Sequence, residues 1–301
     1  MVKRSLLYKI SFLVLVTGLL YSFSSEWGFQ GHKVINSKAV YGMPTTSLFR
    51  FYKKNIEYIT EHAIDPDKRR HSDKDEAPRH YIDIDYYAKE GESPFALMPR
   101  NWNEAKEKYS EDTLLAYGIV PWHVMLMSHR LTEAFKEKDK ERILRLSAEI
   151  GHYIADACVP LHTTLNYDGQ LTGQKGIHSF WETRLVELYI DDYDLLCDQA
   201  FYIDDQEDFI WTIVEESFSN ITRLLEAERK ANSSLNEDQK FMIDDKNGYE
   251  VMYQSEQYSE AFNKGLDGMV EERMRRSIVA VSSFWYTAWV NAGQPNVEVI
   301  E

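Results

Sequence analysis

The chain has 301 residues, of which 44% are hydrophobic and 28% charged, a composition typical of a globular protein with a substantial core. Its net charge of −15 excludes a broad basic surface for duplex DNA, although a local cationic pocket for one phosphate is compatible with it. The two cysteines, Cys158 and Cys197, exclude a disulfide-rich scaffold and a cysteine-based zinc finger, and they either pair or stay buried.

Residues 1–24 have the pattern of a secretory signal peptide. A basic start is followed by an apolar run over residues 10–20 and by small, polar residues up to Ser25. Cleavage after Ser24 satisfies the small-residue rule, and an uncleaved membrane anchor is the alternative. We therefore predict an exported, extracytoplasmic protein, periplasmic or secreted, in which residues 25–301 form a single domain.

Helical spacing of apolar residues dominates the rest of the chain. Stripes at intervals of three and four residues indicate helices at residues 124–135, 143–157, 209–225 and from Val270 to near Gly293. Polar connectors with turn residues lie at residues 65–79, 87–103, 166–176 and 232–248. The best strand-like alternation, at residues 81–85, is short. The predicted fold class is all-α, a compact multi-helix bundle.

The sequence HYIADACVPLH, residues 152–162, places potential metal ligands at the end of one predicted helix. His152 and Asp156 stand one turn apart on the face opposite the apolar stripe, so both side chains can converge on one ion. Pro160 ends the helix, and His162 then hangs from its C-terminal end. A single such pair is more often a polar surface than a metal site, so the motif needs further ligands.

Further ligands are present on both sides of this motif. In GIHSFWE, His178 and Glu182 repeat the same spacing at the start of a helix, so two pairs fall within 31 residues. Upstream, His32, Asp65 and His80 offer three more side chains. Neutral imidazole and carboxylate are suitable zinc ligands, and a catalytic zinc ion characteristically has three of them and an open position for water.

In order and spacing, these motifs resemble the superfamily of bacterial zinc-dependent phospholipases C and fungal single-strand-specific nucleases. The resemblance runs from Trp27 through Glu182 and implies up to three zinc ions in a cleft between helices. By resemblance, the first ion is held by Asp65, His80, His152 and Asp156, the second by Trp27, His32 and the bridging Asp156, and the third by His162, His178 and Glu182.

The resemblance has one departure, at Trp27. In the family this tryptophan is the first residue of the mature chain and binds zinc through its α-amine and carbonyl oxygen. Cleavage after Ser24 leaves two residues ahead of Trp27 and removes the α-amine ligand. Either a second trimming step occurs, another group substitutes, or the site holds fewer ions.

The resemblance implies hydrolysis of a phosphodiester, because two close zinc ions lower the pKa of a shared water and supply hydroxide for in-line attack. Asp65 is both a ligand and the candidate general base. Lys68 is a candidate contact to the substrate phosphate. Tyr81 and Asp83 resemble positions that bind a nucleic-acid base, and they serve a lipid headgroup equally well.

The two branches of the superfamily compete as predictions of the substrate. Glu182 favours the phospholipases, since the nucleases have aspartate there, whereas the spacing from Trp27 to His32 favours the nucleases. We predict phospholipase C-like hydrolysis, with a phospholipid or single-stranded nucleic acid as substrate and no stable protein partner. The alternatives are a single-strand-specific nuclease and a non-catalytic zinc-binding protein.

Overall fold

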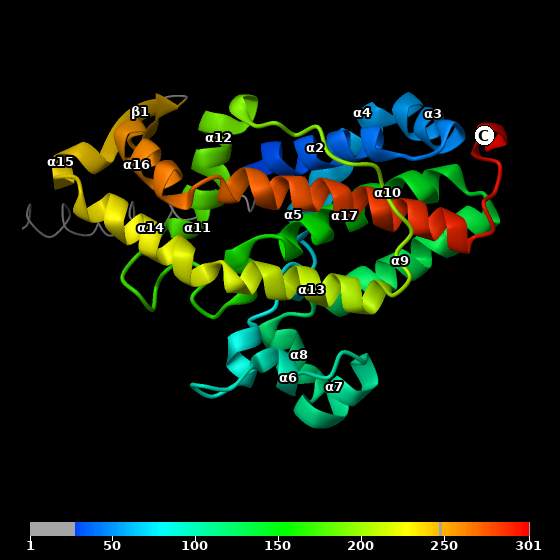
Figure 1. Cartoon of the computed structure of the whole chain (residues 1–301), viewed down its shortest axis with the longest axis horizontal. Coiled ribbons are helices and arrows are strands. Elements are labelled where there is room, and N and C mark those ends of the chain that lie inside the picture. The colour runs from blue at the N-terminus through cyan, green and yellow to red at the C-terminus, as the bar shows by residue number, and fades with distance from the viewer. Residues whose placement is uncertain (1–27, 247–248, 301) are drawn as a thin grey trace, which may run out of the picture.

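The computed structural model describes residues 28–246 and 249–300, and this part of the chain is almost entirely helical (Figure 1). The predicted all-α class is confirmed, with one two-stranded sheet among the described residues. The longer helices are α2 (Gly28–Ala39), α3 (Thr46–Lys54), α7 (Trp102–Tyr109), α9 (Val120–Glu137), α10 (Lys140–Ala157), α13 (Gln206–Ser219), α14 (Ile221–Ser233), α16 (Glu256–Leu266) and α17 (Met269–Asn291). The shorter ones are α4 (Ile56–Glu61), α5 (Asp65–Arg69), α6 (Pro94–Leu97), α8 (Glu111–Tyr117), α11 (Ile177–Ser179), α12 (Leu185–Tyr189) and α15 (Glu237–Lys240).

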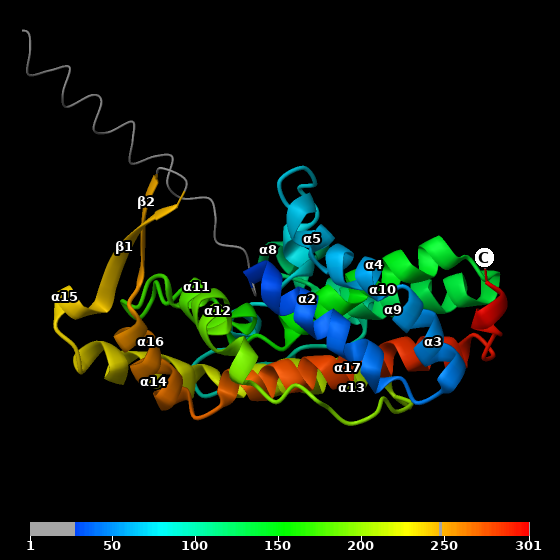
Figure 2. The same ribbon diagram turned by 90° about the horizontal axis from the view of Figure 1, so that it is seen from above.

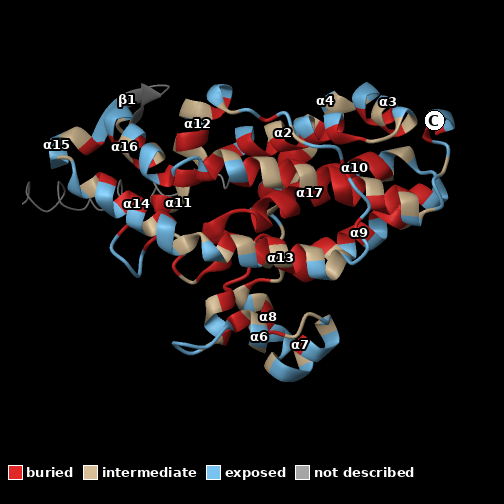
Figure 3. Ribbon diagram, in the orientation of Figure 1, coloured by how far each residue is buried: buried red, intermediate tan, exposed pale blue. Residues whose placement is uncertain are grey.

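Helix α10 is the centre of the bundle. It begins after Asp139, whose side chain accepts a hydrogen bond from the backbone N–H of Arg142, and it packs against α9, α17, α2 and α4. Every residue from Leu146 to Ala157 is buried (Figure 3). The face that carries His152 and Asp156 is therefore not solvent-exposed, because α2, α5 and the intervening 3-10 turn His62–Ile64 cover it.

The apolar stripe over residues 209–225 forms two helices instead of one. Helix α13 ends at Ser219 and α14 begins at Ile221, and the side-chain amide of Asn220 donates to the carbonyl of Glu216 at 2.9 Å. Such local side-chain bonds compete with the helical backbone pattern. Helix α17 runs beside α10 and ends at Asn291, close to the predicted stop at Gly293 (Figure 2).

The strand suggested at residues 81–85 is absent from the described structure, which has a 3-10 turn at Ile84–Tyr87 instead. The backbone there bonds to loops: the N–H of Ile82 donates to the carbonyl of His162 at 2.9 Å, and that of Asp83 donates to Tyr117 at 2.7 Å. Because these two N–H groups are bonded to loops, they do not pair with a neighbouring strand. They tie the segment after His80 to the segment around His162, while α6, α7 and α8 form a lobe beside the body (Figure 1).

A β-hairpin stands at the end of the molecule opposite the C-terminus (Figures 1 and 2). Strand β1 (Phe241–Lys246) pairs antiparallel with β2 (Tyr249–Gln254). Strand β1 lies in the connector predicted at residues 232–248, and β2 follows it. At its base, the Nε of Arg184 donates to the carbonyl of Gln254 at 3.2 Å. Exposed Ile243 and Met252 face each other across the two strands.

Candidate metal centre

Five buried side chains from four segments meet where α2, α5 and α10 pack together. We call them the inner cluster. His152 and Asp156 come from α10, one turn apart, and the others come from α2, from α5 and from the residue after the 3-10 turn Ala77–Arg79. All are at least nine-tenths buried. The inner cluster consists of His32, Asp67, His80, His152 and Asp156.

The ligand atoms of the inner cluster converge on Asp156 and His152. One carboxylate oxygen of Asp156, Oδ2, lies 2.9 Å from Nδ1 of His80 and 3.2 Å from Nε2 of His152. Its other oxygen, Oδ1, lies 3.5 Å from Nε2 of His32. Asp67 approaches from the other side, with Oδ1 at 3.4 Å from Nε2 of His152. A carboxylate that faces ligands on both of its oxygens is suited to bridging two ions.

Asp67 takes the position predicted for Asp65, and this corrects the sequence analysis. The carboxylate of Asp65 points to the other side of α5, where it lies 2.5 Å from Nδ1 of His62 and 3.1 Å from Nζ of Lys68. Residues two apart on a helix are separated by about 200°, so only one of the two carboxylates reaches the cluster. Asp67 is buried, whereas Asp65 is partly exposed.

A second group of ligands, the outer cluster, lies beside the first and consists of His162, His178 and Glu182. Nε2 of His162 lies 3.1 Å from Nε2 of His178 and 3.5 Å from Oε2 of Glu182. Nε2 of His178 lies 3.1 Å from the same Oε2 of Glu182. The predicted helix is confirmed, but Glu182 sits in a π-helical stretch, Phe180–Arg184, a feature that often marks functional sites. Nδ1 of His162 lies 3.7 Å from Asp156, which connects the two clusters.

The charges of the inner cluster are strongly coupled. Burial lowers the pKa of His152, but the carboxylates of Asp156 and Asp67 outweigh burial and raise that pKa well above its usual value. Burial raises the pKa of Asp156, and the charges of His152 and His162 overcome it and hold that pKa well below its usual value. Burial and then His152 lower the pKa of His32 to about 3. The carboxylates of Asp156 and Asp67 therefore favour the protonated form of His152, whereas His32 favours its neutral form.

The donor set fits zinc. Among the described residues, both oxygens of Asp67, both ring nitrogens of His32 and Oδ1 of Asp156 are buried without a hydrogen-bond partner. Oε2 of Glu182 in the outer cluster is in the same situation. Buried polar atoms are normally paired, so this concentration of unpaired atoms in one place points to an absent ligand. Imidazole nitrogens and carboxylate oxygens are the donors that zinc binds.

The remaining predicted residues lie around the clusters. Trp27 and residues 1–24 are outside the described residues. Lys68 is exposed and paired with Asp65, and the hydroxyl of Tyr81 donates to the carbonyl of Ala116 at 3.4 Å. Burial and then the charge of Asp85 raise the pKa of Asp83 to about 7, against the opposing charge of His162. Asp83 is buried next to Ile82, whose backbone N–H donates to the carbonyl of His162 in the outer cluster.

Two residues near the clusters were not identified from the sequence. Asp67 is separated from Asp65 only by Pro66, and the motif DPDKRR contains both carboxylates. The spacing to the other candidate ligands therefore indicates either aspartate equally well. Glu76 is fully buried and lies 3.4 Å from Nε2 of His80. The spacing of four between Glu76 and His80 was visible in the sequence, but it falls in a predicted connector.

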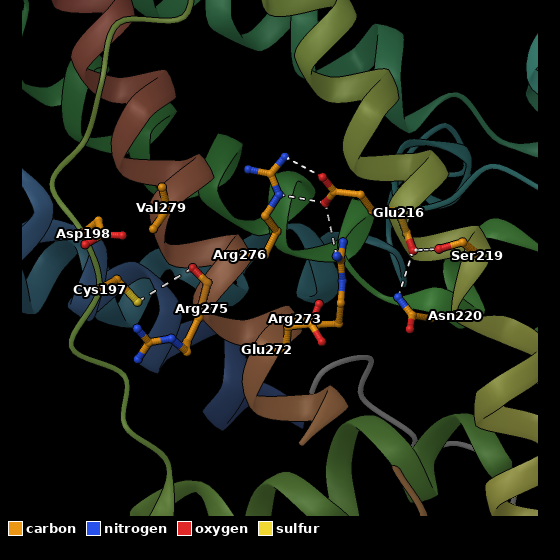
Figure 4. Close-up of a pocket in the computed structure, with 10 residues that line it drawn as sticks. All are labelled: Cys197, Asp198, Glu216, Ser219, Asn220, Glu272, Arg273, Arg275, Arg276 and Val279. Carbon is orange, nitrogen blue, oxygen red and sulfur yellow. Dashed lines mark hydrogen bonds and ion pairs between the residues drawn. The ribbon is translucent and has the colours of Figure 1, made fainter. Parts of the chain in front are cut away.

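A separate surface cavity of about 550 Å³ lies between α13 and α17 (Figure 4). The guanidinium groups of Arg273 and Arg276 point toward Glu216 at 3.2 and 2.8 Å. The other charged residues that line the cavity are Arg275, Asp198 and Glu272, so its basic and acidic side chains are equal in number. No residue of the inner or outer cluster is among the residues that line this cavity. Cys197 borders the cavity and Cys158 is buried elsewhere, and both are free thiols.

Comparison with known proteins is consistent with this geometry. The family described as "Zinc dependent phospholipase C" matches residues 31–236. No curated protein matches the sequence. Among solved structures, alpha-toxin from an avian strain of Clostridium perfringens has a similar fold, with a TM-score of 0.52 and 13% identity. The alignment covers 91% of this chain, which spans 65% of the length of that one.

Proposed function

This chain belongs to the zinc-dependent phospholipase C family, as the resemblance in its motifs predicted, and from that premise we propose that it hydrolyses the phosphodiester bond of a phospholipid headgroup. The observation that carries the proposal is the convergence of the inner and outer clusters within reach of one another, connected through Asp156 and His162. A likeness at 13% identity supports the fold, whereas the substrate rests on the family and the site.

We propose that the clusters hold up to three zinc ions. The first ion takes Asp67, His80, His152 and Asp156, and the third takes the outer cluster. The second takes His32 and the bridging Asp156, together with Trp27 if processing frees its α-amine. Zinc bound here supplies Lewis acidity to a phosphodiester and acidifies a water molecule.

The chain's own residues then bind and orient the substrate. Lys68 is a proposed phosphate contact, and since its ammonium lies 3.1 Å from Asp65, a phosphate must compete with that ion pair. Tyr81 and Asp83 are proposed contacts of the headgroup. The general-base role predicted for Asp65 passes to Asp67, whose carboxylate lies within the inner cluster.

The choice of a phospholipid over single-stranded nucleic acid is supported by two further features. Glu182 is the ligand type of the phospholipase branch. The net charge of −15 works against binding a polyanion, because no excess of basic side chains is present to displace its counterions.

We also propose that the protein is exported after removal of residues 1–24 and that residues 25–301 form one domain. The contacts of α17 with α2, α9 and α10 support the single domain, since this C-terminal helix packs on helices from the rest of the chain. No helix within residues 28–246 and 249–300 is long and apolar enough to cross a membrane.

The test combines metal analysis with assays of the purified mature protein. Phosphatidylcholine, single-stranded DNA, RNA and a soluble aryl phosphodiester are offered in parallel, and hydrolysis of the first without hydrolysis of the nucleic acids supports the proposal. Hydrolysis of nucleic acid alone assigns the nuclease function, and full zinc occupancy without turnover assigns a non-catalytic role. The variant Asp67→Asn is expected to lose zinc and activity, whereas the matched control Asp65→Asn keeps its zinc.

A further inference from the structure

Histidine ligands are usually fixed by a second partner on the ring nitrogen that faces away from the metal. Three histidines of the two clusters follow one pattern, in which Nε2 faces the cluster and Nδ1 lies close to a backbone carbonyl. Nδ1 lies 2.8 Å from Ala63 in His152, 2.8 Å from His80 in His162 and 3.0 Å from Tyr167 in His178. A carbonyl only accepts, so each of these rings carries its proton on Nδ1 and presents Nε2 to the metal.

His80 is reversed. Its Nδ1 faces the inner cluster, at 2.9 Å from Asp156 and 3.1 Å from Nε2 of His152. Its Nε2 points the other way and lies 3.4 Å from Oε1 of Glu76. The outward partner of this one ring is therefore a carboxylate instead of a carbonyl.

Glu76 is built into the interior as an anion. It is completely buried, and its other carboxylate oxygen, Oε2, accepts hydrogen bonds from Nη1 of Arg79 at 2.7 Å and Nε of Arg69 at 3.3 Å. The hydroxyl of Tyr153 donates to Oε1, the same oxygen that faces His80. Two guanidinium groups offset the charge, so the carboxylate remains an acceptor beside the ring.

We propose that Glu76 is the positioning residue that holds the ring proton of His80 on Nε2 and so leaves the lone pair of Nδ1 for zinc. An imidazole whose N–H faces a carboxylate is also a more basic metal ligand than one facing a carbonyl. The proposal rests on the zinc site of the proposed function, and it adds a specific requirement that the first ion has and the third does not.

A second buried carboxylate, Glu149, offers a matched control that separates a purely structural role of Glu76 from a positioning role, because Arg69 pairs with both carboxylates. Nη1 of Arg69 also lies 2.9 Å from Oε1 of Glu149, which belongs to α10. Both carboxylates therefore tie α5 and the segment after it to the body of the protein. Glu76 in addition lies 3.4 Å from Nε2 of His80, a residue of the inner cluster.

The experiment compares the parent chain with Glu76→Gln and Glu149→Gln. Zinc content and affinity are measured by competition with a chromophoric chelator, and the free energy of unfolding is measured on the metal-free proteins. We expect Glu76→Gln to weaken binding of one zinc ion by about 10–100-fold and Glu149→Gln to bind zinc as the parent does. Equal zinc affinity in the two variants would overturn the inference.

A second measurement needs no variant that must fold. In the zinc-loaded parent chain, ¹⁵N-detected NMR of the histidine rings reports which nitrogen carries the proton, with the His80 signal assigned through couplings from its ring to its own backbone. We expect His80 to be protonated on Nε2 and His152, His162 and His178 on Nδ1. A proton on Nδ1 of His80 overturns the inference alone, whereas a parent chain that binds no zinc overturns the proposed function as well.

Discussion

Replacement of Gly151 by alanine tests how closely α2 and α10 must approach each other to bring His32 against His152. The rings of these two histidines stack with their centroids 3.8 Å apart, and Gly151 is the residue just before His152. A Cβ added at position 151 meets Oδ1 of Asn36 at 2.1 Å and Nδ2 at 3.0 Å. In an ordinary helix interior the same change stabilises a protein by about 0.5–1 kcal/mol.

The structure reverses that sign. The side-chain amide of Asn36 donates to the carbonyl of Ala148 at 3.0 Å and to that of Ile59 at 3.4 Å. Turning the amide away costs about 0.5–1.5 kcal/mol for each bond, and forcing the helices apart costs about 1–3 kcal/mol. Either relaxation therefore costs about 1–3 kcal/mol, and after the gain in helix propensity of about 0.5–1 kcal/mol is subtracted, Gly151→Ala is expected to lower the free energy of unfolding by about 0.5–2 kcal/mol.

Urea unfolding of Gly151→Ala, Asn36→Ala and the double variant checks this reasoning at a fixed zinc concentration. In the Asn36→Ala background the added Cβ meets no amide, so the same change is expected to stabilise by about 0.5–1 kcal/mol. A single variant as stable as the parent would refute the close-contact argument. A loss of equal size in both backgrounds would assign the cost to another neighbour.

Three further changes test other parts of the molecule. Removing zinc with a chelator is expected to lower the thermal midpoint in calorimetry, since a ligand at 100 times its Kd adds about 2.7 kcal/mol, and an unchanged midpoint contradicts metal binding. Burial raises the pKa of Glu216, but Arg276 and Arg273 outweigh burial and lower it, so this carboxylate stabilises the fold above its unfolded pKa of 4.5 and that contribution is lost as the pH falls. Urea unfolding between about pH 3 and 6 should therefore show a shallower pH dependence in Arg276→Gln than in the parent. Arg273→Ala is expected to lower the free energy of unfolding by about 3 kcal/mol in the same assay. Buried Arg273 donates to the carbonyl of Cys158 at 3.0 Å and to Oγ of Ser217 at 2.9 Å, and the substitution removes both bonds. A loss below about 1 kcal/mol would contradict this.

Local spacing in the sequence was enough to pair the candidate ligands that share a helix. His152 with Asp156 and His178 with Glu182 lie one turn apart, and a single helix fixes such a pair whatever surrounds it. The helices themselves were predictable for the same reason, since apolar residues at intervals of three and four specify a buried face. The meeting of distant segments in one site followed from the family resemblance, and not from any local pattern.

The choice between Asp65 and Asp67 could not be made from spacing. Helix α5 has only five residues, so the sequence contains no periodic pattern that fixes its rotation against α10. The role of Glu76 depends on His80 and Arg69 arriving at the same place from different segments. The hairpin was missed although Asn-Gly at residues 247–248, between two apolar runs, is typical of a two-residue turn.

The residues of the two clusters extend from His32 on α2 to Glu182 in the π-helical stretch, and the inner cluster combines four separate segments. A ribosome must therefore release most of the chain before the full constellation can assemble, and partly synthesised intermediates offer only weak, incomplete chelators. If the protein crosses its membrane unfolded, it reaches the other side without bound zinc. The supply of zinc in the receiving compartment then sets how much of the population matures.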